Sequence, residues 1–155
     1  MIGWLLDTNV VAELIRPAGS ARVKGWAAMQ AESALYLSIL TIAEYDKGIA
    51  NLADDDTRRT AYAAARDRLI DRFAGRVLPV ADPVVRRWGV LSGTIRRDTG
   101  HPPPVIDTML AATALECDLY LVTRNTRDVL RCGAALFNPW EDDLGAVDVS
   151  PGRRR

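Results

Sequence analysis

The sequence predicts an α/β fold with a central parallel sheet and helices on both sides. Short apolar segments alternate along the 155-residue chain with longer segments whose apolar residues recur at helical spacing. Strands and helices that alternate in this way form right-handed crossovers in a parallel sheet. The length allows one domain, at roughly 100–200 residues per domain. Because the periodic pattern stops near residue 142, we expect a folded domain over 1–142 and a disordered tail over 143–155.

The first half of the chain contains three expected strands. Residues 2–6 form a short apolar run that stops abruptly at Asp7, as a buried parallel strand does. From residue 10 the apolar residues recur at helical spacing until Pro17 ends the helix. The same criteria predict strands at 35–40 and 76–80, and helices at 20–30, 41–52 and 57–73.

The second half continues the alternation. We expect Asp82 to be the N-cap of a helix that has Pro83 at its first position, where proline is well tolerated. The segment 99–104 contains three consecutive prolines and is expected to be a loop. The remaining elements are a helix at 107–116, a strand at 119–123, a short helical turn at 127–131 and a strand at 135–137.

Composition excludes several classes of protein. Lys and Arg number 20, as do Asp and Glu, so the chain lacks the basic balance that marks most nucleic-acid binders. A small acidic site inside a local basic rim remains compatible with that balance. With two cysteines and one histidine, neither a disulfide framework nor a zinc cluster is expected, so any metal ion would be held by oxygen. No apolar run approaches the ~18 residues of a membrane span, and no signal-peptide pattern is present, so we expect a cytoplasmic protein.

Acidic and amide side chains follow several of the expected strands. Asp7 follows the first strand, Glu44 comes one helical turn after the second, and Asn125 and Asp128 follow the fourth. Asp107 opens the helix that precedes this fourth strand. Ligands of parallel α/β sheets bind outside the carboxyl ends of the strands, so these side chains are expected at one edge.

Converging carboxylates without His or Cys suit a hard cation. Mg²⁺ keeps several waters and takes one or two carboxylates plus phosphate oxygens, and such a site can activate water against a phosphodiester. Each acid also has a structural interpretation. Asp7 and Asp107 would cap or complement helix N-termini, Glu44 would be solvated, and Asp128 would be a turn residue. The placement of all these acids at one edge favours a cation-binding site over separate structural roles.

Five segments form an ordered series of motifs along the chain. They are LLDTNV (5–10), TIAE followed by KG (41–48), DTMLAATA (107–114), LVTRN with Asp128 (121–128) and NPW (138–140). Taken in order, they resemble the motifs of PIN-domain ribonucleases, and most closely those of VapC/FitB-type toxins of toxin–antitoxin pairs. The likeness covers about residues 2–141.

The resemblance implies a Rossmann-like α/β/α PIN domain with Mg²⁺- or Mn²⁺-dependent endoribonuclease activity. It also implies a homodimer that is neutralised by a small VapB/FitA-like antitoxin. Carried onto this chain, Asp7 and Asp107 would be the principal metal ligands and Glu44 a third acid, on the metal or the attacking water. Either Asn125, where many relatives have Asp, or Asp128 would complete the site.

Two further features concern partners. Arg16, Lys47, Arg124 and Arg127 are expected near the same edge and would either steer phosphates or be ordinary solvated residues. The helices at 41–52 and 57–73 carry more apolar side chains than one face of a small sheet needs. Surplus apolar surface of this kind indicates an interface, with two-fold symmetry as the default.

Three alternative functions are open. A haloacid-dehalogenase-like phosphatase would need a second acid at position 9, where this chain has Asn9. A receiver-type signalling domain would need an acid pair at the end of the first strand, where only Asp7 stands. A non-catalytic antitoxin-binding module would retain the fold without the chemistry, although the joint presence of the acids speaks against a degenerate site.

Overall fold

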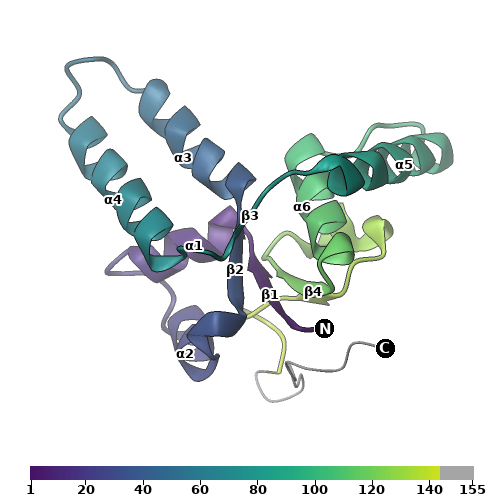
Figure 1. The fold of residues 1–155 in the computed structure, drawn as a ribbon, viewed down its shortest axis with the longest axis horizontal. Coiled ribbons are helices and arrows are strands. Elements are labelled where there is room, and N and C mark those ends of the chain that lie inside the picture. Colours follow the sequence, from purple (N-terminus) through teal and green to yellow (C-terminus); the bar gives the residue numbers. More distant parts are fainter. Residues whose placement is uncertain (144–155) are drawn as a thin grey trace.

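The computed structural model describes residues 1–143 and has an α/β architecture with a five-stranded, wholly parallel sheet (Figure 1). The strand order is β3-β2-β1-β4-β5. The strands are β1 (Gly3–Leu6), β2 (Leu35–Ser38), β3 (Val77–Leu78), β4 (Leu119–Val122) and β5 (Leu136–Phe137). The order reverses beside β1, which pairs with β2 on one side and with β4 on the other. This topology confirms the α/β fold with a central parallel sheet.

Helices cover both faces of the sheet. In Figure 1, α3 and α4 form a hairpin that projects to one side, whereas α5 and α6 pack together on the other. The helices are α1 (Thr8–Ile15), α2 (Ala21–Met29), α3 (Ile39–Ala50), α4 (Arg58–Arg72), α5 (Asp82–Thr99), α6 (Val105–Glu116) and α7 (Thr126–Val129), with 3-10 turns η1 (Glu32–Ala34) and η2 (Leu130–Cys132). No helix within residues 1–143 combines the length and apolarity needed to cross a membrane.

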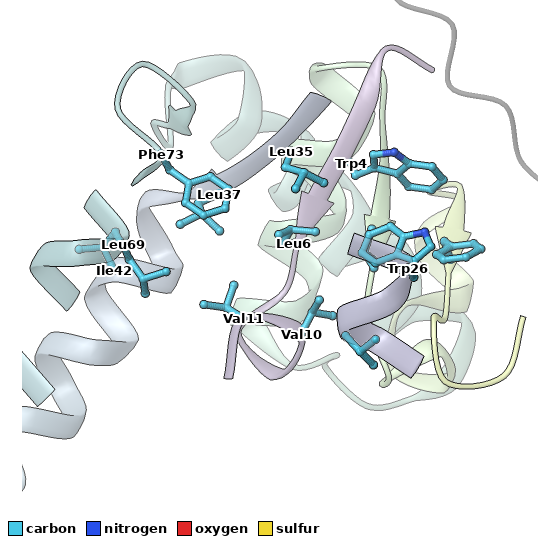
Figure 2. Close-up of a cluster of buried hydrophobic side chains, with 13 residues drawn as sticks. Trp4, Leu6, Val10, Val11, Trp26, Leu35, Leu37, Ile42, Leu69 and Phe73 are labelled. Atoms are coloured by element: carbon cyan, nitrogen blue, oxygen red, sulfur yellow. The ribbon is translucent and has the colours of Figure 1, made fainter. Parts of the chain in front are cut away.

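Successive side chains of each strand enter two separate cores. Trp4 and Leu6 of β1 point into the cluster beneath α1 to α4, while Leu5 points into the cluster beneath α5 and α6. Figure 2 shows the first cluster, where Trp4 meets the ring of Trp26 edge-on at 5.3 Å between centroids. Burial on both faces explains why the strands are continuous apolar runs rather than alternating ones.

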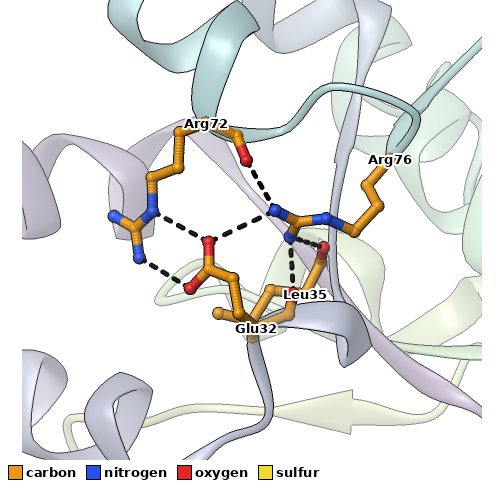
Figure 3. A network of polar contacts seen from close by, with 4 residues as sticks. All are labelled: Glu32, Leu35, Arg72 and Arg76. Carbon is orange, nitrogen blue, oxygen red and sulfur yellow. Dashed lines mark hydrogen bonds and ion pairs between the residues drawn. The ribbon is translucent and has the colours of Figure 1, made fainter.

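An ionic network anchors the edge of the sheet at β3 (Figure 3). Arg72 at the end of α4 donates from Nε to Glu32 Oε1 at 3.0 Å and from Nη2 to Oε2 at 3.1 Å. Arg76, just before β3, donates to the backbone carbonyls of Glu32, Leu35 and Arg72. The network therefore ties the end of α4 to the start of β2 and β3, and it fixes where the α3–α4 hairpin joins the sheet.

Several expected boundaries differ from the structure, among them the strands expected at 35–40 and 76–80, which span only Leu35–Ser38 and Val77–Leu78. Asp82 is the first residue of α5 and not its N-cap, which is Ala81, so Pro83 occupies the second helical position. Helix α3 begins at Ile39 and not at residue 41, because the side chain of Ser38 accepts the Leu40 N–H at 3.2 Å and starts the helix earlier. Helix α6 begins at Val105, two residues before the expected start. The tail predicted over 143–155 lies, apart from Asp143, outside the described residues.

Candidate active site

Asp7 lies at the carboxyl end of β1 and is almost completely buried, with 8% of its surface exposed. One carboxylate oxygen, Oδ1, accepts the Thr8 N–H at 2.6 Å, so Asp7 caps α1 as its structural interpretation predicts. The other, Oδ2, accepts the Thr123 hydroxyl and the Asn9 side-chain amide, each at 2.6 Å. The carboxylate is thus oriented from β1, α1 and the end of β4 at once.

Asp107 lies in the first turn of α6 and is only partly buried. Its Oδ2 accepts the side-chain amide of Asn125 at 2.9 Å. Asn125 also donates its backbone N–H to the Thr123 hydroxyl at 2.9 Å. Asn125, through its side-chain amide and its backbone N–H, and the Thr123 hydroxyl therefore connect the Asp107 carboxylate to the Asp7 carboxylate, although the two acids are 100 residues apart in sequence.

The two acids carry shifted pKa values. Burial is the main cause of the raised pKa of Asp7, the hydrogen bonds from Thr123 and Thr8 oppose it, and the charge of Glu44 adds to it. Burial likewise raises the pKa of Asp107, and the negative charges of Asp7 and Asp128 raise it further. These acids therefore interact electrostatically at one edge of the sheet, and a bound cation would relieve their repulsion.

Glu44 approaches this edge from α3, where its carboxylate accepts a hydrogen bond from the Thr8 hydroxyl. Thr8 and Thr41 hydroxyls are also in contact at 3.4 Å. Asp128 lies in α7, is exposed, and acts on Asp107 through its charge. Of the two candidates for the fourth position, Asn125 bonds directly to an acid and Asp128 does not among the contacts of residues 1–143.

Thr123 joins the site, although sequence reasoning did not assign it a role. Its hydroxyl donates to Asp7 and accepts from Asn125 and, at 3.3 Å, from Asn9, while its side chain is buried. The available signal was a hydroxyl residue directly after an apolar strand at the point where the strand order reverses. The sequence indicated only that Asn9 is not the second acid of a phosphatase. In the structure, its side-chain amide donates to Asp7, and its Oδ1 accepts the backbone N–H of Arg124 at 3.3 Å.

The carboxylates at this edge fit a hard divalent cation that takes few ligands from the protein. No three His, Cys, Asp or Glu side chains within residues 1–143 converge tightly enough to form a metal cluster, and Glu44 is turned toward Thr8. Asp7 and Asp107 nevertheless supply two interacting carboxylates, and neither forms an ion pair with a basic group within residues 1–143. Mg²⁺ is commonly bound by one or two carboxylates together with several waters.

A shallow apolar hollow of about 290 Å³ lies beside Glu44. It is lined by Thr8 and Ala12 from α1, by Tyr45 and Gly48 from α3 and by Tyr62 from α4. An apolar surface next to an acidic edge can bury part of another chain against the site.

Fold and site together define the class of this protein, and comparisons with known proteins agree. The PIN domain family model matches residues 4–131, so the chain belongs to the PIN-domain family. It is similar to Toxin FitB of Neisseria gonorrhoeae, with 33% identity over 89% of this chain and 99% of FitB. It is also similar to VapC ribonuclease Y4jK of Sinorhizobium fredii, with 31% identity over 88% of this chain and 97% of that protein. The crystal structure of FitAcB from N. gonorrhoeae superposes with a TM-score of 0.77 and 32% identity, covering 88% of this chain and 98% of the other.

Proposed function

We propose that this protein is the endoribonuclease toxin of a toxin–antitoxin pair and hydrolyses RNA phosphodiester bonds with Mg²⁺, for which Mn²⁺ substitutes. The observation that carries this is that the charges of the buried Asp7 and the partly buried Asp107 interact at the carboxyl edge of the sheet. The similarity to a VapC ribonuclease supports the reaction class.

Each side chain has a role in this reaction. Asp7 and Asp107 would hold the metal ion, and Glu44 would contribute a third carboxylate toward the ion or the attacking water. When bound, Mg²⁺ polarises the phosphodiester and activates water. Asn125 completes the fourth position by orienting Asp107, and Asp128 adds negative charge beside it.

Asn9 argues against the phosphatase alternative. A haloacid-dehalogenase-like phosphatase would need a second acid two residues after Asp7, and this position carries Asn9. The Asn9 side chain donates its amide to Asp7 Oδ2, so it orients the nucleophile candidate and cannot act as a second acid.

RNA cleavage by the purified protein tests the proposal. We expect cleavage with Mg²⁺ or Mn²⁺ and none in EDTA, so undiminished cleavage in EDTA would refute a metal mechanism. Asp7→Asn and Asp107→Asn should each abolish cleavage, and Glu44→Gln should reduce it severely. The changes Asn125→Ala and Asp128→Asn should be milder, because both residues serve the fourth position.

A matched control removes one exposed acid far from the site. Asp55 lies in the connection between α3 and α4 and is exposed, so Asp55→Asn should retain full activity. Equal losses in Asp55→Asn and Asp107→Asn would show that net charge, and not the site, governs cleavage. Circular dichroism of each variant separates lost chemistry from lost fold.

We also propose a cytoplasmic homodimer that a VapB/FitA-like antitoxin neutralises. FitB is named as a toxin, and FitAcB is a toxin–antitoxin complex of the same fold. Ile39, Tyr62 and Ile70 of the α3–α4 hairpin are 41–44% exposed, and the apolar hollow leads from this hairpin to Glu44. A monomer in light scattering at micromolar concentration would contradict the dimer. Unchanged cleavage in the presence of the protein encoded by the adjacent gene would contradict neutralisation.

A further inference from the structure

Arg124 lies between the two residues that donate hydrogen bonds to the principal acids. Its neighbour Thr123 donates to Asp7, and its other neighbour Asn125 donates to Asp107. Its own backbone N–H binds Asn9, which in turn binds Asp7. The backbone of Arg124 is therefore fixed by the same hydrogen bonds that orient the acids.

The side chain of Arg124 lies over the ring of Trp140, with the guanidinium carbon 5.6 Å from the ring centroid. Trp140 is itself well anchored, because its side chain packs against the core cluster and its backbone N–H donates to Asn138 Oδ1 at 3.0 Å. Arg22 of α2 holds the same segment by donating to the carbonyls of Pro139 and Asp142 at 3.1 and 2.6 Å. The platform under the guanidinium is thus built from three parts of the fold.

The guanidinium of Arg124 has no acidic partner within residues 1–142. The residue is exposed, and no carboxylate within residues 1–142 forms an ion pair with it, whereas nine other arginines pair with acids. Stacking on an aromatic face leaves the planar N–H donors of a guanidinium free at its edge. Such a group is preorganised for a phosphate that arrives from solvent.

We propose that Arg124, seated on Trp140, is a positioning residue that binds an RNA phosphate next to the one that is cleaved. The inference rests on the proposed ribonuclease function and adds a specific contact to it. The acids would hold the cation that contacts the cleaved phosphate, but they repel the neighbouring phosphates of the RNA backbone, which a nearby cationic side chain can bind. Arg124 provides this cation at the carboxyl end of β4 without neutralising the acids, since its side chain is turned onto Trp140.

The test measures steady-state cleavage and direct RNA binding. Arg124→Ala should raise KM about tenfold, the range expected for a lost charge-assisted hydrogen bond, with a smaller change in kcat. Its binding to a labelled single-stranded RNA should show a salt slope smaller by about 0.7, because one phosphate contact is lost. Arg68→Ala, which removes an exposed arginine of α4, is the matched control and should change neither value.

Two variants of the platform separate the stacking from the charge. Trp140→Phe keeps an aromatic face and should retain near-normal KM, whereas Trp140→Leu should raise KM about two- to fivefold while the salt slope stays unchanged. Thermal melting of both variants controls for lost packing of the ring against the core. Equal effects of the Phe and Leu changes, at equal stability, would overturn the role of the ring.

Binding measurements in the Asp107→Asn background keep this inference separate from the proposed reaction. If the wild-type protein does not cleave RNA, the proposed function fails while the RNA affinity of Arg124→Ala can still be compared with that of Arg68→Ala. If wild-type protein cleaves RNA but Arg124→Ala has unchanged KM and salt slope, the inference on Arg124 is overturned and the ribonuclease assignment stands.

Discussion

Replacing Thr123 by valine tests whether the hydroxyl network sets the chemistry of the site. The change keeps the side-chain shape but removes the donor that binds Asp7 Oδ2 at 2.6 Å and the acceptor of the Asn125 N–H at 2.9 Å. The Thr123 hydrogen bond lowers the pKa of Asp7 against the effect of burial, so its loss should raise that pKa further. A proton would then compete with the metal ion for the Asp7 carboxylate up to a higher pH.

The magnitude follows from the geometry. A hydrogen bond to a charged group contributes roughly 1.5–3 kcal/mol, and removing the partner of a metal-binding side chain commonly costs about 10- to 100-fold in metal affinity or activity. We therefore expect Thr123→Val to bind Mn²⁺ about 10- to 100-fold more weakly in calorimetric titrations. The acid limb of its cleavage profile should move to higher pH, because Asp7 must lose its proton to hold the metal.

Two controls make this prediction decisive. Thr123→Ser keeps the hydroxyl and should behave like the wild-type protein. Thr113→Val removes another fully buried hydroxyl, which donates to the Met109 carbonyl at 2.9 Å and contacts no acid. A Thr123→Val variant that binds Mn²⁺ as tightly as Thr123→Ser would refute the reasoning, and so would an equal loss in Thr113→Val.

Three further changes have defined outcomes. Folding raises the pKa of Asp107, so the charge of this carboxylate destabilises the metal-free protein as pH rises above the ordinary carboxyl pKa. Asp107→Asn should therefore raise the melting temperature in EDTA at pH 7. The same change should abolish the stabilisation of the protein by Mg²⁺. The pKa of Glu32 is lowered by Arg72, so the stability it contributes is present at neutral pH and disappears as pH falls through that lowered value. Glu32→Gln should therefore cost less than about 1 kcal/mol in urea denaturation at pH 7, since the pair is half exposed, and this cost should shrink as pH falls through the lowered pKa. Gly3→Ala should cost about 1–3 kcal/mol in the same assay, because a Cβ would lie 2.6 Å from the Ala34 carbonyl oxygen across the β1–β2 pair.

The sequence predicted the sheet well because burial on both faces leaves a strong apolar signal. The segments 2–6 and 119–123 were recognised as strands by length and by their abrupt polar ends, and both are central strands of the sheet. Boundaries set by single caps were less predictable. Asp82 has the chemistry of an N-cap but lies inside α5, where it forms an i,i+4 ion pair with Arg86 at 2.8 Å instead.

For the candidate site, the location of the acids could be predicted from the sequence, but the hydrogen bonds that orient them could not. That acids would gather at one edge followed from the rule that strand ends meet there, and Asp7 and Asp107 do interact. Which hydrogen bonds orient them could not be predicted, since the Thr123 contact to Asp7 spans 116 residues and depends on the pairing of β1 with β4. Glu44 bonds to Thr8 because α1 and α3 meet at this edge, a contact that no local pattern encodes.

The structure of the edge explains why acids can be both well ordered and electrostatically unfavourable. Asp7 receives three hydrogen bonds, which fix its carboxylate without supplying a positive charge, and the pKa of the carboxylate is still raised. Burial and repulsion therefore destabilise the charged carboxylates, and either a proton or a bound cation relieves this cost. Neutral donors already orient the Asp7 carboxylate, and its negative charge has no positive partner among them. A bound metal ion should therefore raise the stability of the protein without rearranging the sheet. We predict this coupling of stability to metal binding from the proposed metal site, whereas an aspartate that only capped α1 would gain nothing from the charges of Glu44 and Asp107.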